Sequence, residues 1–153
     1  MLQTVLEELS KKEELPSNII LLRKICQAGF LEFCLAVKPD YIATKFHKTI
    51  ANKLQKFYEE VRDGKDQNIM LEMQPQIGKS TLVSELFPAW VLGKEAWPVI
   101  VASYGSDLAQ QKSSNCRDIV NSDVYQMIFP DSKLNPETAA KDYWKTTNGG
   151  CLY

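Results

Sequence analysis

Histidine is almost absent from this chain, cysteine is sparse, and there is no excess of basic charge. The four cysteines (Cys26, Cys34, Cys116 and Cys151) form no CxxC pair, and only His47 offers an imidazole nitrogen, so a zinc site has little support. Lysine and arginine number 18 against 19 acidic residues, for a net charge of −1. A domain that mainly grips nucleic acid usually carries a basic excess, so the composition argues against that role.

Neither an export signal nor a membrane-spanning run is recognisable. The first residues, MLQTVLEELSKKEE, are acidic and amphipathic, which does not suit a signal peptide. The most apolar region, residues 18–37, is interrupted by Arg23, Lys24 and Glu32, so it predicts a buried helix pair. Scattered thiols fit a reducing compartment, and we expect a cytoplasmic protein.

The first third of the chain has the patterns of helices. With 153 residues and 44% apolar residues, the chain is long and apolar enough to bury a core. Residues 2–9 place leucines and a valine on one helical face. Pro16 and Ser17 then interrupt, with Ser17 or Asn18 as the predicted N-cap of the next helix. A further helix is indicated by apolar residues at helical spacing, with Gly64 as its end. These residues are Phe46, Ile50, Leu54, Phe57 and Val61.

After Gly64 the pattern changes to alternating strands and helices. Residues 68–73 (NIMLEM) have strand length, and residues 79–92 predict a helix that Pro88 should kink. Residues 97–105 (WPVIVASYG) predict a second strand, apolar on both faces. Ser106 is the predicted cap of a helix that stops near residue 121, and a short segment at 122–130 follows. This order favours an α/β fold with a parallel sheet.

A turn signal stands near the last residues of the sequence. Asn148-Gly149 is typical of a two-residue β-hairpin turn, because both residues tolerate positive φ. The chain stops four residues after this turn, so a returning strand has barely begun.

The sequence PQIGKST contains part of a phosphate-binding loop. Such a loop needs a helix whose free amides face an anion, a lysine for the β- and γ-phosphates, and a hydroxyl for Mg²⁺. Gly78, Lys79, Ser80 and Thr81 match these needs, but Met73 stands where the full motif has its first glycine. Gly-Lys-Ser/Thr occurs by chance in roughly one chain of ten at this length. The loop residues alone are therefore compatible with a nucleotide site and with an accidental match.

A wider resemblance covers most of the chain. From about Tyr41 onward the sequence resembles the ATPase part of the large terminase subunit of tailed bacteriophages, the motor that drives DNA into the capsid. The matching pieces, in the order of that family, are FHKTIANKLQKF, PQIGKST, SELFPAWVLGK, VIVASYGSDLAQQKSSNCRDIVNSDVYQMIFPDSKL and AKDYWKTTNGG. The strings FPAWVLG and ASYGSDLA are more specific than the loop itself.

The resemblance implies a fold and a site. It implies an incomplete P-loop NTPase-type parallel sheet at residues 65–153, preceded by a helical segment at residues 1–64. Many terminases have a loop of the type Pro-Pro-Arg-x-Gly-Lys-Ser without the leading glycine. Here Pro75 is in place and Gln76 replaces the usual arginine, which removes a charge that would help to neutralise phosphate. The implied ligands are ATP and Mg²⁺, with Gln76, Gly78, Lys79, Ser80 and Thr81 at the nucleotide and Ser80 at the metal.

Each of the other candidate residues has a functional and a structural interpretation. His47 lies about where the family places contacts to adenine, and a partly exposed helix histidine is an equally good interpretation. The loop Ser103–Ser106 corresponds to a segment near nucleic acid in related motors, but a strand end with a helix cap is favoured. Arg117 is better explained as a surface arginine than as a charge-stabilising finger. The three tryptophans are predicted to be core or interface residues.

An acidic element for hydrolysis is not found in these residues. In this class an apolar strand ends in Asp, commonly followed by Glu; the nearest string, MIFPD, contains Pro130, which does not suit a central strand. The resemblance places that strand, and a nuclease domain, after the point where this chain ends. We therefore expect weak nucleotide binding without hydrolysis.

The resemblance also implies a cellular context and partners. A complete subunit would act in the bacterial host cell with double-stranded DNA, the small terminase subunit and the capsid portal, and with no membrane. Two alternatives remain open from the sequence. One is a non-catalytic prophage remnant or interaction module, and the other is a helicase-like P-loop ATPase.

Overall fold

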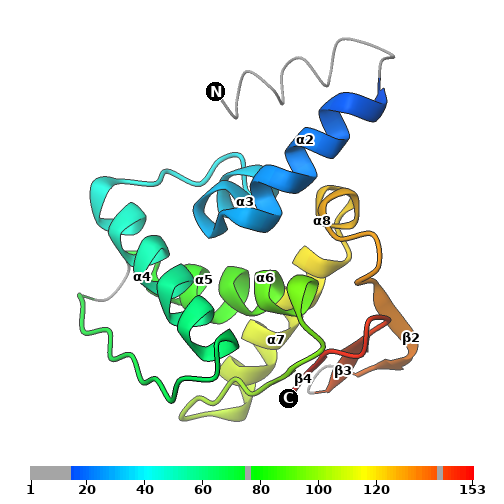
Figure 1. The fold of residues 1–153 in the computed structure, drawn as a ribbon. Coiled ribbons are helices and arrows are strands. Elements are labelled where there is room, and N and C mark those ends of the chain that lie inside the picture. The colour runs from blue at the N-terminus through cyan, green and yellow to red at the C-terminus, as the bar shows by residue number, and fades with distance from the viewer. Residues whose placement is uncertain (1–14, 75–76, 141–142) are drawn as a thin grey trace.

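The computed structural model describes residues 15–74, 77–140 and 143–153. These residues form an α/β fold with helices and a four-stranded mixed sheet. The strands lie together on one side of the molecule, helix α4 lies on the opposite side, and α2 extends outward (Figure 1). The predicted helix at residues 2–9 lies outside the described residues.

The elements follow one another along the described chain in a nearly all-helical first part and a mixed second part. The helices are α2 (Leu15–Ala28), α3 (Phe30–Val37), α4 (Lys45–Arg62), α5 (Lys79–Thr81), the π-helical turn η1 (Leu82–Leu86), α6 (Phe87–Lys94), α7 (Ser106–Val120) and α8 (Asp123–Ile128). The strands are β1 (Pro98–Val99), β2 (Leu134–Ala139), β3 (Trp144–Thr146) and β4 (Cys151–Leu152).

The predicted buried helix pair is present as α2 and α3. Gly29 separates the two helices in an extended conformation, with φ −118° and ψ 121°. Cys26, Phe30 and Phe33 have no exposed surface, so the pair forms part of the core. The predicted N-cap at Ser17 or Asn18 is wrong, because both residues lie inside α2.

Helix α4 ends as its sequence predicts. Gly64 has φ +81°, its amide donates to Val61 O, and the amide of Lys65 donates to Glu60 O. This pair of bonds is a Schellman motif, in which glycine adopts the left-handed conformation at little cost. The side chains of α4 that are fully buried are Ile50, Ala51, Leu54 and Tyr58.

The helix predicted at residues 79–92 is continuous but widened by one π-turn. The amide of Phe87 donates to Leu82 O, five residues back, immediately before Pro88. A proline in an ordinary α-helix loses one amide bond and its ring clashes with a carbonyl of the preceding turn. The wider turn lies where that strain would arise, so Pro88 is accommodated by a π-bulge.

The sheet has the order β1-β4-β3-β2 and is mostly antiparallel. Only β1 and β4 pair in parallel. The predicted strand at residues 68–73 is wrong, since this segment belongs to no helix or strand. Leu71 and Met73 are partly buried and pack on the core, whereas Met70 is 84% exposed. The side chains thus alternate as in a strand, but no described segment forms a backbone ladder with them.

The predicted hairpin turn at Asn148-Gly149 is present with a different loop. The Thr146 amide donates to Gly150 O and the Gly149 amide to Thr146 O, with Gly149 at φ +99°. This is a three-residue loop closed by a left-handed glycine instead of the two-residue form. Asn148 also anchors the turn, because its Nδ2 donates to Leu92 O over 2.8 Å.

Helix α7 connects the sheet with the helical core. It begins one residue earlier than a Ser106 cap requires, because Gly105 is the N-cap and Ser106 is already the first helical residue; Asn121 is the C-cap. Trp144 Nε1 of β3 donates to Ser113 Oγ of α7 over 3.0 Å. The core assignment of tryptophan is confirmed for Trp90 and Trp144, which have no exposed surface. No described helix is long and apolar enough to cross a membrane.

Candidate functional site

The candidate site is the turn that precedes the helical stretch 79–94. Gly78 has φ +79° and ψ 9°, the left-handed region that residues with a side chain rarely adopt. The first intrahelical bond joins the Leu82 amide to Gly78 O over 3.1 Å. The glycine of the Gly-Lys-Ser motif therefore turns the chain directly into a helix.

The helix start leaves donors available. The first four amides of a helix lack an intrahelical acceptor, and in the described residues those of Lys79, Ser80 and Thr81 have no backbone acceptor either. Lys79 is partly exposed, and its ammonium has no hydrogen-bond or ion-pair partner within the described part of the chain. Ser80 is exposed. Free amides, a lysine and a hydroxyl thus lie within one turn of helix.

His47 connects helix α4 with this turn. Its Nε2 lies 2.7 Å from Ile77 O, and its Nδ1 lies 2.8 Å from Thr44 Oγ1 and 3.3 Å from the Thr44 amide nitrogen. A carbonyl only accepts, so we assign the Nε2–H tautomer, with Nδ1 accepting from Thr44. Both ring nitrogens are engaged. Ile77 O is bound by the imidazole and not by a helix amide, so Gly78 O accepts the first helix bond and the helix begins at Lys79.

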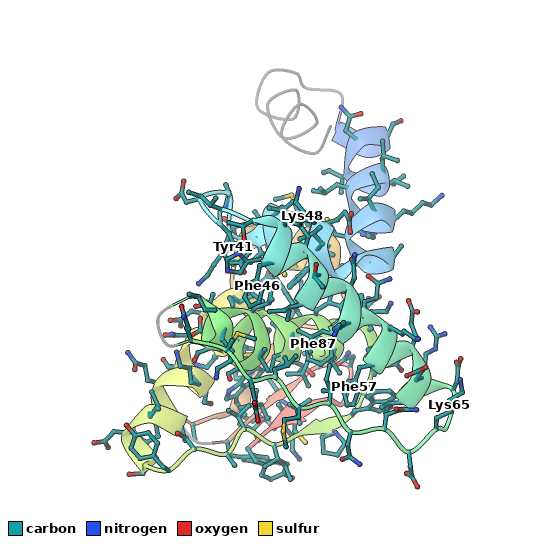
Figure 2. The ribbon with its side chains drawn as sticks, turned by 90° about the vertical axis from the view of Figure 1, so that its left-hand side faces the viewer. Tyr41, Phe46, Lys48, Phe57, Lys65 and Phe87 are labelled. Atoms are coloured by element: carbon teal, nitrogen blue, oxygen red, sulfur yellow. The ribbon has the colours of Figure 1, made fainter. Side chains whose placement is uncertain are left out.

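A pocket of about 540 Å³ lies beside the turn. Its lining comes from the end of α3, the segment before α4 and the helix start, and consists of Val37, Lys38, Pro39, Asp40, Tyr41, Gly78 and Thr81. The Tyr41 and Phe46 rings pack edge-on against His47 at centroid distances of 5.5 and 5.7 Å. These two aromatic residues lie at the N-terminal end of α4 (Figure 2). The pocket therefore brings a cation, a carboxylate and an aromatic ring to the loop.

The hydroxyl of Tyr41 is turned away from solvent. The oxygen is buried and has no hydrogen-bond partner in the described structure. Burial raises the pKa of Tyr41 to about 12, and the nearby Cys34 thiol adds to the rise. The Tyr41 ring lines the pocket, whereas its hydroxyl is removed from water and gains no hydrogen bond from the described residues in return.

The other residues singled out from the sequence do not line this pocket or lie outside the described residues. Gln76 and Pro75 lie outside the described residues. Ser103 and Ser106 are exposed, and Tyr104, between β1 and α7, is 98% exposed. The Arg117 guanidinium donates to Ala140 O over 3.4 Å, beyond strand β2.

A buried carboxylate near the loop was not predicted from the sequence. Glu85 is 2% exposed in the π-turn, and its Oε1 accepts from Lys112 Nζ at 2.8 Å and Asn115 Nδ2 at 3.0 Å. Lys38 Nζ lies 3.6 Å from the other oxygen. No local signal indicates this cluster, because its members come from three separate elements. The only sequence cue is a glutamate on the apolar face of a helix.

The site offers phosphate ligands but no preformed cage for a cation. Within the described ranges no group of three or more His, Cys, Asp or Glu side chains could hold a metal ion. Mg²⁺ bound with phosphates needs only one or two protein oxygens, since water and phosphate supply the rest. The exposed Ser80 hydroxyl fits that more modest requirement.

Comparison with protein-family models, curated proteins and solved structures finds no match for this chain.

Proposed function

We propose that this chain is the ATP-binding part of a phage terminase large subunit, the ATPase motor that packages DNA into the capsid. The single observation that carries the proposal is the helix start at Gly78: a left-handed glycine, amides without acceptors, and an unpaired Lys79 among the described residues. These are the features that bind phosphate at a helix N-terminus. The proposed fold is an incomplete P-loop NTPase-type parallel sheet to which the parallel pair β1 and β4 would belong, whereas the β2–β3 and β3–β4 pairs are antiparallel.

Each residue of the loop has a role in the proposal. Lys79 pairs with the terminal phosphates, the amides of residues 78–81 surround the β-phosphate, and Ser80 ligates the Mg²⁺ that accompanies ATP. His47 shapes the loop by holding Ile77 O. The magnesium ion neutralises phosphate charge when it is bound.

Calorimetric titration with Mg·ATP tests the proposal. Wild-type protein should bind, and Lys79→Ala should lose at least tenfold in affinity, because a charge-assisted contact to phosphate is removed. Lys53→Ala is the matched control, since Lys53 is an exposed lysine on α4 and the charge change is identical. Equal binding by wild type and Lys79→Ala would contradict the proposal.

We expect binding without sustained phosphate release. The described lining of the pocket includes one carboxylate, Asp40, whereas hydrolysis in this class uses an acidic strand end for Mg²⁺ and for water. Phosphate release that is lost in Lys79→Ala would overturn this expectation.

A non-catalytic interaction module is the second candidate. The observation that favours it is the segment 68–74, which is partly apolar and has no ladder partner in the described residues. Unpaired extended backbone is a template for pairing with another chain. Absence of heat at millimolar Mg·ATP would favour this candidate over the first.

A further inference from the structure

The cluster around Glu85 holds more positive charge than its carboxylate requires. Glu85 faces two lysines, Lys38 and Lys112, and one amide, Asn115. A buried carboxylate is expensive to desolvate and needs close donors. Lys112 and Asn115 both donate to Oε1, at 2.8 and 3.0 Å, so this oxygen is hydrogen-bonded and the carboxylate charge is paired with Lys112. Two lysines against one glutamate give this cluster a net charge of +1.

The two lysines are held unequally. The Lys112 side chain is 19% exposed and within hydrogen-bond distance of Glu85, whereas Lys38 is 41% exposed and lies 3.6 Å away. At 3.6 Å the Lys38 ammonium is beyond hydrogen-bond distance of Glu85, so Lys38 is the more loosely held of the two lysines. Lys38 can therefore leave Glu85 without leaving a buried charge unpaired.

Lys38 lies beside the proposed phosphate site. It lines the pocket of about 540 Å³ together with Gly78 and Thr81. Glu85 follows Thr81 by about one helical turn, roughly 5 Å along the axis, and Thr81 lines the same pocket as Lys38. Lysine is a flexible chain with a compact charge at its tip, suited to a move over this distance.

We propose that Lys38 is a phosphate-contacting residue that exchanges the Glu85 carboxylate for the phosphate chain of a nucleoside triphosphate. Lys112 keeps the Glu85 charge paired during this exchange, and Lys112 and Asn115 keep Oε1 hydrogen-bonded. The contact adds a second cation to Lys79 and comes from the segment between α3 and α4 that lines the pocket. This inference rests on the proposed nucleotide binding.

The test compares Lys38→Gln, Lys38→Arg and the control Lys53→Gln by calorimetry with Mg·ATP, tripolyphosphate and adenosine. Lys38→Gln should bind Mg·ATP and tripolyphosphate roughly tenfold more weakly, with adenosine binding unchanged. Lys38→Arg should restore most of the affinity, and Lys53→Gln should match wild type. Because Lys38 is a surface side chain, these variants should fold like wild type, which circular dichroism checks.

The outcomes separate the two proposals. Absence of nucleotide binding by the wild-type protein overturns both. Binding that is lost in Lys79→Ala but unchanged in Lys38→Gln overturns only the role of Lys38. Weakened ATP binding with unchanged tripolyphosphate binding also overturns it, because the contact would then lie outside the phosphate chain.

Discussion

His47 Nε2 donates to Ile77 O over 2.7 Å, and this bond joins the first turn of α4 to the residue before Gly78. The imidazole occupies the N3 position of its helix and receives a bond from the Thr44 amide. It thus replaces the glutamate or glutamine of a capping box. One side chain caps α4 and fixes the carbonyl at the start of the candidate phosphate loop.

The first prediction concerns this bond. His47→Ala should weaken Mg·ATP binding about tenfold and cost about 1 kcal/mol of stability, because Ile77 O loses its donor and the turn is no longer held open. His47→Gln retains an amide donor and should recover part of both. Calorimetry and urea unfolding measure the two effects. An alanine variant with unchanged ATP affinity would show that the bond does not organise the site.

The second prediction concerns Gly78. Gly78→Ala should abolish detectable nucleotide binding and cost about 1–2 kcal/mol, because φ +79° is unfavourable for alanine and the new Cβ would lie 3.4 Å from His47 Nε2. Gly64→Ala is the matched control. It has φ +81° and nothing within 4 Å of the new Cβ. Both variants should lose similar thermal stability, but only Gly78→Ala should lose binding, so equal binding by the two would contradict a role for the turn.

Local signals predicted the helices and the hairpin better than the sheet. Helix α4 and its end at Gly64 follow from helical spacing and from a glycine, which act over a few residues. The segment 68–73 has the composition of a strand, but a strand requires a partner for its backbone groups, and none of the described residues provides one. The register of β4 between β1 and β3 likewise depends on residues distant in sequence.

In the candidate site, too, the residues of one contiguous motif were predicted, and the contacts between distant segments were not. Gly78, Lys79 and Ser80 were predicted from one contiguous motif, and they lie together at one helix start. Lys38 and Glu85 were missed because their proximity depends on how α3 packs against the helix after the loop. For His47 the resemblance implied a contact to adenine, with a partly exposed helix histidine as an equal alternative, and its bond to a loop carbonyl became visible only from the backbone geometry.

The third prediction tests the unpartnered hydroxyl of Tyr41. Tyr41→Phe removes a buried oxygen without a hydrogen bond and should stabilise the protein by about 1 kcal/mol in urea unfolding. Nucleotide affinity should be unchanged, since the ring that lines the pocket is kept. Tyr125→Phe is the control of opposite sign: its hydroxyl bonds Ala89 O at 3.0 Å, so its loss should destabilise by about 1 kcal/mol. Destabilisation by Tyr41→Phe would show that the oxygen has a partner.

The fourth prediction concerns alkaline pH. Burial raises the pKa of the Cys26 thiol to about 12, and it raises those of Cys34 and Cys116 as well. In the unfolded chain these thiols ionise near pH 8.5. The folded state then holds more protons than the unfolded state, so this contribution to stability is complete below about pH 8.5 and is lost as the pH rises toward the folded values.

The measurement is the urea-unfolding free energy between about pH 7.5 and pH 9, where unfolded tyrosine, with a pKa of about 10, is mostly protonated. It should fall with rising pH, and a Cys26→Ala variant should fall less steeply, because it has one shifted thiol fewer. Ellman's reagent should label Cys26, Cys34 and Cys116 slowly in the folded protein and rapidly in urea. Rapid labelling of all three thiols without denaturant would contradict their burial.

The last prediction concerns Gly93 at the end of α6. A Cβ at this position would lie 2.5 Å from the ring of Phe129, which is 3% exposed. That ring also packs against Phe33 and Tyr125 at centroid distances of 5.9 and 5.1 Å, so it has little room to move. Alanine gains up to about 1 kcal/mol over glycine in a helix, but overpacking costs about 1–3 kcal/mol. Gly93→Ala should therefore lower the melting temperature.

The loss of stability caused by Gly93→Ala should be smaller in a Phe129→Leu background, because a smaller side chain leaves space for the methyl group. A rise in melting temperature for Gly93→Ala alone would mean that the helix end and Phe129 do not pack as closely as the structure places them.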